Sequence, residues 1–182
     1  MNTIQTIWSA LTSQNEMFVK IQGIPLCFLD AYVGMIYFTT ILNIKSSPKR
    51  KLIYVITYGI IANFITFLVP QPYNVFINLF VWPLMVFFIL KTTILKSILS
   101  EIITLVATSI LEFLFANIYH LIFNVTSETI IVTPIYRLAV ALSIYGIIYL
   151  IAKLVNLFKV NIPVFENMST RTKILLILNA LL

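Results

Sequence analysis

The stretch 97–120 constrains the fold most, because it is apolar enough to lie in a bilayer and yet carries two carboxylates and the only histidine of the chain. Its polar side chains fall within about 40° of one another on a helix: Glu101, Thr108, Glu112 and Tyr119. A charge that faces lipid without compensation costs several kcal/mol. We therefore expect this helix to turn its polar stripe toward other helices or toward a wet cavity.

The composition indicates an integral membrane protein. Of the 182 residues, 60% are apolar and 10% are charged, whereas soluble domains are nearer half apolar and a quarter charged. The net charge of +6 comes from Lys and Arg scattered between apolar runs, which is typical of topology signals and not of a nucleic-acid surface. The single cysteine excludes an intrachain disulfide, and no phosphate-binding or metal-binding motif is present. We expect no cofactor and no metal.

Hydropathy predicts an all-α, polytopic transmembrane helical bundle with five complete spans and the start of a sixth. The predicted spans are 24–44, 52–69, 73–90, 98–123 and 135–158. Residues 21–158 would form this transmembrane bundle, and 124–134 would be a loop.

Residues 1–20 are predicted to form an amphipathic segment that lies in the membrane interface. Apolar residues recur at helical spacing on one side of this segment: Ile4, Ile7, Trp8 and Leu11. Ser13 and Glu16 then fit a capping box that would begin the next helix at Met17.

The basic residues predict the orientation. The stretches 45–51, 91–97 and 159–173 carry most of the Lys and Arg, whereas the turns at 70–72 and 124–134 carry none. By the positive-inside rule, the N-terminus and these two turns are extracellular, and 159–173 is a cytoplasmic basic loop.

The apolar run 174–182 has nine residues, whereas a transmembrane helix needs about 20. It is either a partial sixth helix or the start of a truncated further span, and we expect the latter.

Depth along the spans predicts two ion pairs. Glu101 and Lys153 would lie near the cytoplasmic side, and Glu112 and Arg137 nearer the outer side, where Asp30 would join them. Pairing lowers the cost of burying such charges. Glu101 and Lys153 are candidates for a structural ion pair. Asp30, Glu112 and Arg137 are candidates for a ligand-facing pocket, with helix packing alone as the simpler interpretation.

His120 is predicted at the outer end of its span and is a further candidate for the polar pocket. The chain has no second His or Cys at ligand spacing, so His120 is not expected to bind a metal. Tyrosines near the span ends are interpreted as part of an interfacial aromatic belt.

Several stretches resemble the membrane-sensing region of AgrC-like (GHKL-type) bacterial sensor histidine kinases. These are IWSALTSQNEMFVKI, the acid-bearing IPLCFLDAYVGMIYFTTILNIK, SPKRKL, LVPQP, KTTILKSILSEI and PIYRL. The resemblance covers nearly the whole chain. It implies a multi-pass cell-membrane receptor, in quorum sensing for example, that detects an extracellular peptide or small-molecule signal.

The same resemblance implies a homodimer and relay to a response regulator through a cytoplasmic kinase domain. No phosphoacceptor histidine or ATP-binding lobe can be matched to these residues, since the single histidine is His120. We therefore expect this chain alone to be no enzyme, and no catalytic residue is assigned.

Two other classes remain open. One is a small transport subunit, such as the substrate-capture component of a vitamin importer, in which buried Glu and Asn would bind the substrate. The other is a membrane-embedded accessory or immunity protein without a ligand.

Overall fold

The structure, a computed structural model, describes residues 3–13, 16–70 and 73–158. These residues form helices without any strand, which confirms the predicted all-α class. The helices are α1 (Thr3–Thr12), α2 (Glu16–Ile41), α3 (Pro48–Leu68), α4 (Tyr73–Leu90), α5 (Ile94–Phe123), α6 (Ser127–Val132) and α7 (Pro134–Leu157).

The predicted membrane bundle is confirmed. Four described helices, α2, α3, α5 and α7, are long and apolar enough to cross a bilayer. The helix α4, which the sequence predicts as the third span, is apolar but shorter, at 18 residues or about 27 Å. The predicted basic loop 159–173 and the predicted span 174–182 lie outside the described residues.

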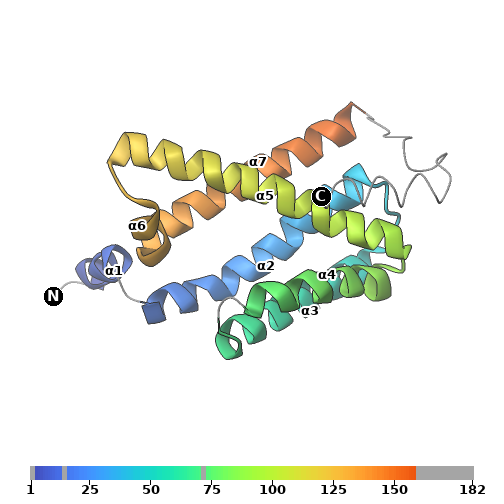
Figure 1. Ribbon diagram of the computed structural model, residues 1–182, viewed down its shortest axis with the longest axis horizontal. Helices are drawn as coiled ribbons and strands as arrows, with labels where there is room; N and C mark the ends of the chain where they lie inside the picture. The colour runs from blue at the N-terminus through green and yellow to red at the C-terminus, as the bar shows by residue number, and fades with distance from the viewer. Residues whose placement is uncertain (1–2, 14–15, 71–72, 159–182) are drawn as a thin grey trace.

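The long helices alternate in direction along the chain, whereas α2 and α7, which pack against each other, run in the same direction, so the bundle has two distinct ends (Figure 1). One end carries α1, α6 and the turn between α3 and α4, and we call it the α1/α6 end. The other carries the connections after α2 and α4 with their lysines and arginines, and we call it the basic end. The helix α5 crosses over α2 and meets α7.

One boundary agrees closely with the sequence prediction and one differs. The capping box at Ser13 and Glu16 predicts a helix that begins at Met17, and α2 begins at Glu16, after the separate helix α1 (Thr3–Thr12). The predicted loop 124–134 contains the short helix α6. This helix forms because the Thr126 hydroxyl accepts a hydrogen bond from the Thr129 N–H at 3.3 Å, which caps a new helical turn.

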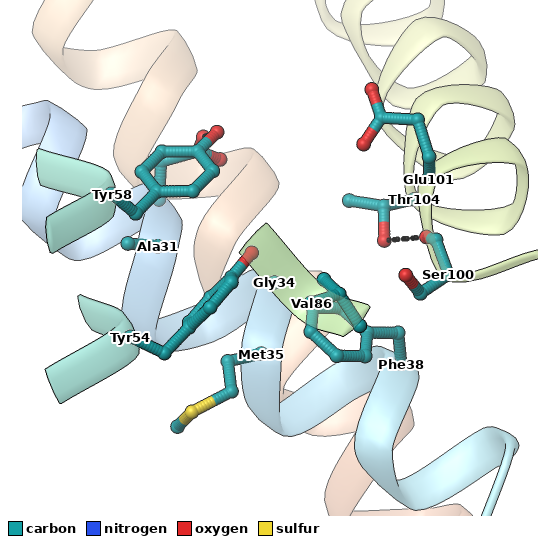
Figure 2. A pocket seen from close by; sticks show the side chains of 11 residues that line it. Ala31, Gly34, Met35, Phe38, Tyr54, Tyr58, Val86, Ser100, Glu101 and Thr104 are labelled. Atoms are coloured by element: carbon teal, nitrogen blue, oxygen red, sulfur yellow. Dashed lines mark hydrogen bonds between the residues drawn. The ribbon is translucent and has the colours of Figure 1, made fainter. Parts of the chain in front are cut away.

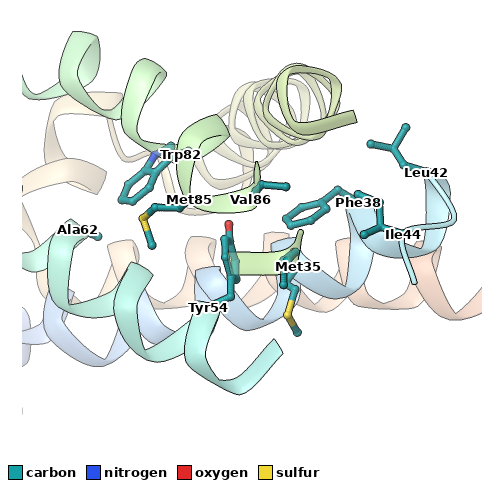
Figure 3. Close-up of a cluster of buried hydrophobic side chains, with 10 residues drawn as sticks. Met35, Phe38, Leu42, Ile44, Tyr54, Ala62, Trp82, Met85 and Val86 are labelled. Carbon is teal, nitrogen blue, oxygen red and sulfur yellow. The ribbon is translucent and has the colours of Figure 1, made fainter. Parts of the chain in front are cut away.

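The central helix α2 packs one face against α3 and the opposite face against α7. On the α3 side, Met35 and Phe38 join a buried cluster with Tyr54, Trp82 and Val86 (Figure 3). On the α7 side the buried cluster contains Val33, Tyr37, Val140, Ile144 and Ile148. Side chains from α5 pack against both clusters. This helix therefore links the two halves of the bundle.

The end of α2 is tied to the start of α5. Asn43 has φ 48°, and the Ile44 N–H donates to the Thr39 carbonyl at 2.9 Å, which is the left-handed helix ending that Asn tolerates. The Lys96 ammonium then donates to the Leu42 carbonyl at 3.0 Å. A cation at a helix C-terminus is favourable, so this contact holds the two helices together at the basic end.

The helices α2 and α3 approach closely at Gly59. A Cβ added at this position would overlap the Phe28 ring. Without a side chain, the α3 backbone packs directly on this ring, as small residues allow in membrane bundles.

We predict that Gly59→Ala destabilises the protein by about 1–3 kcal/mol, because the added methyl group overpacks the Phe28 contact. Gly146→Ala is the matched control on α7, where nothing lies within 4 Å of an added Cβ, and it should be neutral. Thermal unfolding in detergent measures both. Adding Phe28→Leu to Gly59→Ala should restore part of the loss, and equal stability of the two glycine variants would contradict the close approach.

Candidate functional site

A hydrogen-bonded carboxyl group lies at the middle of the bundle. The Tyr58 hydroxyl donates to Asp30 Oδ2 at 2.7 Å. Both residues are near the midpoints of their helices, and antiparallel packing brings these midpoints together. The sequence placed Asp30 near the outer start of its span, which is wrong because α2 begins at Glu16 and extends the helix by two turns before Asp30.

Beside Asp30 is a cavity of about 30 Å³ between α2, α3, α4 and α5 (Figure 2). A space of this size can hold a water molecule if polar groups surround it. The lining residues are Asp30, Ala31, Gly34, Met35, Phe38, Tyr54, Tyr58, Val86, Ser100, Glu101 and Thr104. The wall is apolar on the Phe38 side and oxygen-rich on the side of Asp30 and Glu101.

The hydroxyl groups of α5 bond within their own helix. Ser100 Oγ donates to the Ser97 carbonyl at 2.7 Å, and Thr104 Oγ1 donates to the Ser100 carbonyl at 2.7 Å. Because their protons are used in this way, both oxygens present lone pairs to their surroundings. The Tyr58 ring is held by stacking on Trp82, with ring centroids 3.9 Å apart.

The cavity confirms part of the stripe predicted on α5. Glu101 and Thr104 face α2 and line the cavity, and Gly34 lies opposite with 3.6 Å between a Cβ added there and Thr104 Cγ2. Glu112 does not belong to this cavity and is exposed on the surface of the described structure. The stripe divides because α5 leaves α2 and crosses toward α7.

Neither predicted ion pair forms among the described residues. Lys153 is exposed on α7, whereas Glu101 points into the cavity. Arg137 is half-buried near the start of α7, and its charge acts on Cys27 and Tyr145. The predicted pairs were based on depth along the spans, and depth does not fix the direction in which a side chain leaves its helix.

The residues of the predicted outer group, Asp30, Glu112 and Arg137, do not line this cavity together. The charges of all three residues reach Tyr145 on α7, and Glu112 also acts on Asp30. The cavity lining includes Asp30 and neither of the other two.

His120 helps to close the turn after α5. Its Nδ1 atom lies 3.0 Å from the Val125 carbonyl, and Asn124 has the left-handed φ of 54° that ends the helix. Among the described residues, no group of three or more His, Cys, Asp or Glu side chains could hold a metal ion.

Sequence reasoning missed the two tyrosines of the site. No role was predicted from the sequence for Tyr54 or Tyr58, yet Tyr54 is 3% exposed and both line the cavity. Their spacing of four residues places them on one face of α3, and this signal could have paired them with an acid on a neighbouring helix.

The chain shows no match to a known family model, to a curated protein or to a solved structure.

We predict that Tyr58→Phe lowers the free energy of unfolding by about 1–3 kcal/mol, because it removes the hydrogen bond to a buried carboxyl group. Tyr54→Phe removes a hydroxyl that has no hydrogen-bond partner among the described residues and should cost less. Thermal unfolding in detergent compares the two variants, and an equal loss in both would argue against the Asp30–Tyr58 bond.

Proposed function

We propose that this chain is the membrane-embedded sensing region of a two-component signalling histidine kinase, resembling the AgrC-like type. It detects an extracellular peptide or small-molecule signal and carries out no catalysis itself. It acts as a homodimer and relays to a response regulator through a kinase domain that these residues do not supply.

The cavity in the interface between α2 and α5 carries this proposal. A sensor must have two helix arrangements that a signal can favour differently. Here α5 reaches from the α1/α6 end to the cavity, and its contact with α2 is made by small side chains around about 30 Å³ of unfilled space. A space at a helix interface lets α5 shift against α2 at low cost, since few packed atoms must be displaced.

The signal would bind at the α1/α6 end. The last turns of α5 expose apolar side chains there, including Leu121 and Phe123, and the short helix α6 packs against α7 beside them. An apolar peptide suits such a surface because burying apolar area is the main driving force of association.

A fusion protein tests the coupling. The full 182-residue chain is joined to the cytoplasmic dimerisation and catalytic region of a histidine kinase and reconstituted in nanodiscs. Tyr58→Phe should change basal autophosphorylation about fivefold, because loss of a bond worth about 1 kcal/mol shifts a two-state equilibrium by that factor.

Tyr32→Phe is the matched control, since Tyr32 is an exposed tyrosine of α2. Its basal output should equal that of the unmodified fusion. Equal output from both variants would contradict a signalling role for the cavity and favour the transport-subunit alternative.

The proposed orientation places the α1/α6 end outside the cell, with 45–51 and 91–97 in the cytoplasm. Single cysteines introduced in a Cys27→Ser background, at Ser127 near α6 and at Ser47 in the basic connection, should react differently with an impermeant maleimide added to intact cells. We predict labelling at 127 and protection at 47, and the opposite pattern would reverse the orientation.

A further inference from the structure

The cavity contains two acids without a cationic partner. Asp30 and Glu101 both line it, and none of the lining residues is Lys, Arg or His. The nearest lysine along α5, Lys96, donates instead to the Leu42 carbonyl at 3.0 Å. Two uncompensated carboxylates inside a membrane bundle would be costly and would repel each other.

The position of Tyr54 is a second, independent indication that the cavity binds a polar ligand. Its side chain is 3% exposed, and its hydroxyl extends into the cavity between Tyr58 and Glu101 (Figure 2). No described residue forms a hydrogen bond with this hydroxyl. The hydroxyl oxygen borders the open space of the cavity, where a polar ligand could complete its hydrogen bonding.

The surrounding atoms define the chemistry of the guest. Asp30, Glu101 and the hydroxyls of Tyr54, Ser100 and Thr104 supply only oxygen ligands, which suit a small hard cation. The cavity volume of about 30 Å³ is more than a single small ion or water molecule needs. Among the described residues, no group of three acids is available for a divalent metal ion.

We propose that the cavity binds a small monovalent cation, Na⁺ or a proton carried by water, between Asp30 and Glu101. The cation neutralises part of the charge of the two carboxylates and receives an oxygen lone pair from Tyr54. Glu101 and Thr104 are half-buried, so the cavity is not sealed against entry. This proposal goes beyond the sensing function and does not rest on it.

The other titratable groups around the two acids are distributed over every neighbouring helix. They are Cys27 on α2, Tyr54 and Tyr58 on α3, Glu112 on α5, and Arg137 and Tyr145 on α7. Arg137 acts on Cys27 and Tyr145. The negative charges of Asp30 and Glu101 are therefore neutralised mostly by the proposed cation.

The test measures the midpoint of thermal unfolding, Tm, of the full chain in phosphatidylcholine nanodiscs. Tm is compared in NaCl and in N-methyl-D-glucamine chloride at equal ionic strength, over pH 5 to pH 8. A site that is saturated with Na⁺ should raise Tm by roughly 5 °C or more, because a ligand that binds only the folded state stabilises it. Glu101→Gln and Asp30→Asn should abolish the difference between the two salts, and Tyr54→Phe should reduce it.

If the guest is a proton, Na⁺ has no effect, and Tm in N-methyl-D-glucamine chloride falls as the pH rises. Glu101→Gln should then flatten this pH dependence. Glu128→Gln is the matched control, since it changes an exposed acid on α6 outside the cavity lining, and it should keep the behaviour of the unmodified chain. Because each variant is compared with itself in two solutions, a lower overall stability does not obscure the result.

Two results would overturn the proposal. One is a Tm that depends on neither Na⁺ nor pH in the unmodified chain. The other is a dependence that persists unchanged in both Glu101→Gln and Asp30→Asn, because the cation would then act elsewhere.

Discussion

The hydrogen bond between Asp30 and Tyr58 is the contact on which the arrangement of the bundle depends. A carboxyl group among apolar helices must have a partner, and this one lies at 2.7 Å on the neighbouring helix. The bond fixes the register of α2 against α3. That register places Phe28 over Gly59, the one position next to Tyr58 where the absence of a side chain lets the helices approach. A shift in register would separate Asp30 from Tyr58 and would place the Phe28 ring against a residue that has a side chain, since Gly59 is the only glycine of α3.

Much of the fold was predictable because it depends on local signals. The helical class and the approximate limits of the spans follow from apolar runs and from Pro48, Pro70 and Pro134, which lie at helix ends, whereas Pro25 and Pro83 lie inside helices. The inward orientation of Glu101 on α5 was also predictable, since an uncompensated carboxylate that faces lipid is costly, and Glu101 lines the cavity. These features need only the period of a helix and the free energy of transfer into a membrane.

The composition of the site was less predictable because it depends on helix azimuth and on partners distant in sequence. Asp30 bonds a tyrosine 28 residues away, and nothing in either local sequence specifies that choice over Arg137. Lys153 matches Glu101 in depth but lies exposed on another helix. Tyrosine is a residue type that is common in the interfacial belts of membrane proteins. Only the tertiary packing brings the hydroxyl groups of Tyr54 and Tyr58 to the centre of the bundle.

The bond from Lys96 to the Leu42 carbonyl gives α5 a fixed point at one end. From there the helix continues for about 40 Å to Phe123 but for only about 8 Å to Glu101. A rigid rod that turns about Lys96 is therefore a lever with a reduction of about five to one. A displacement of about 5 Å at the far tip becomes about 1 Å at the carboxylate, which is the scale on which an oxygen atom gains or loses a ligand contact. With this geometry, a large displacement of the far end of α5 would correspond to a small displacement of the Glu101 carboxylate.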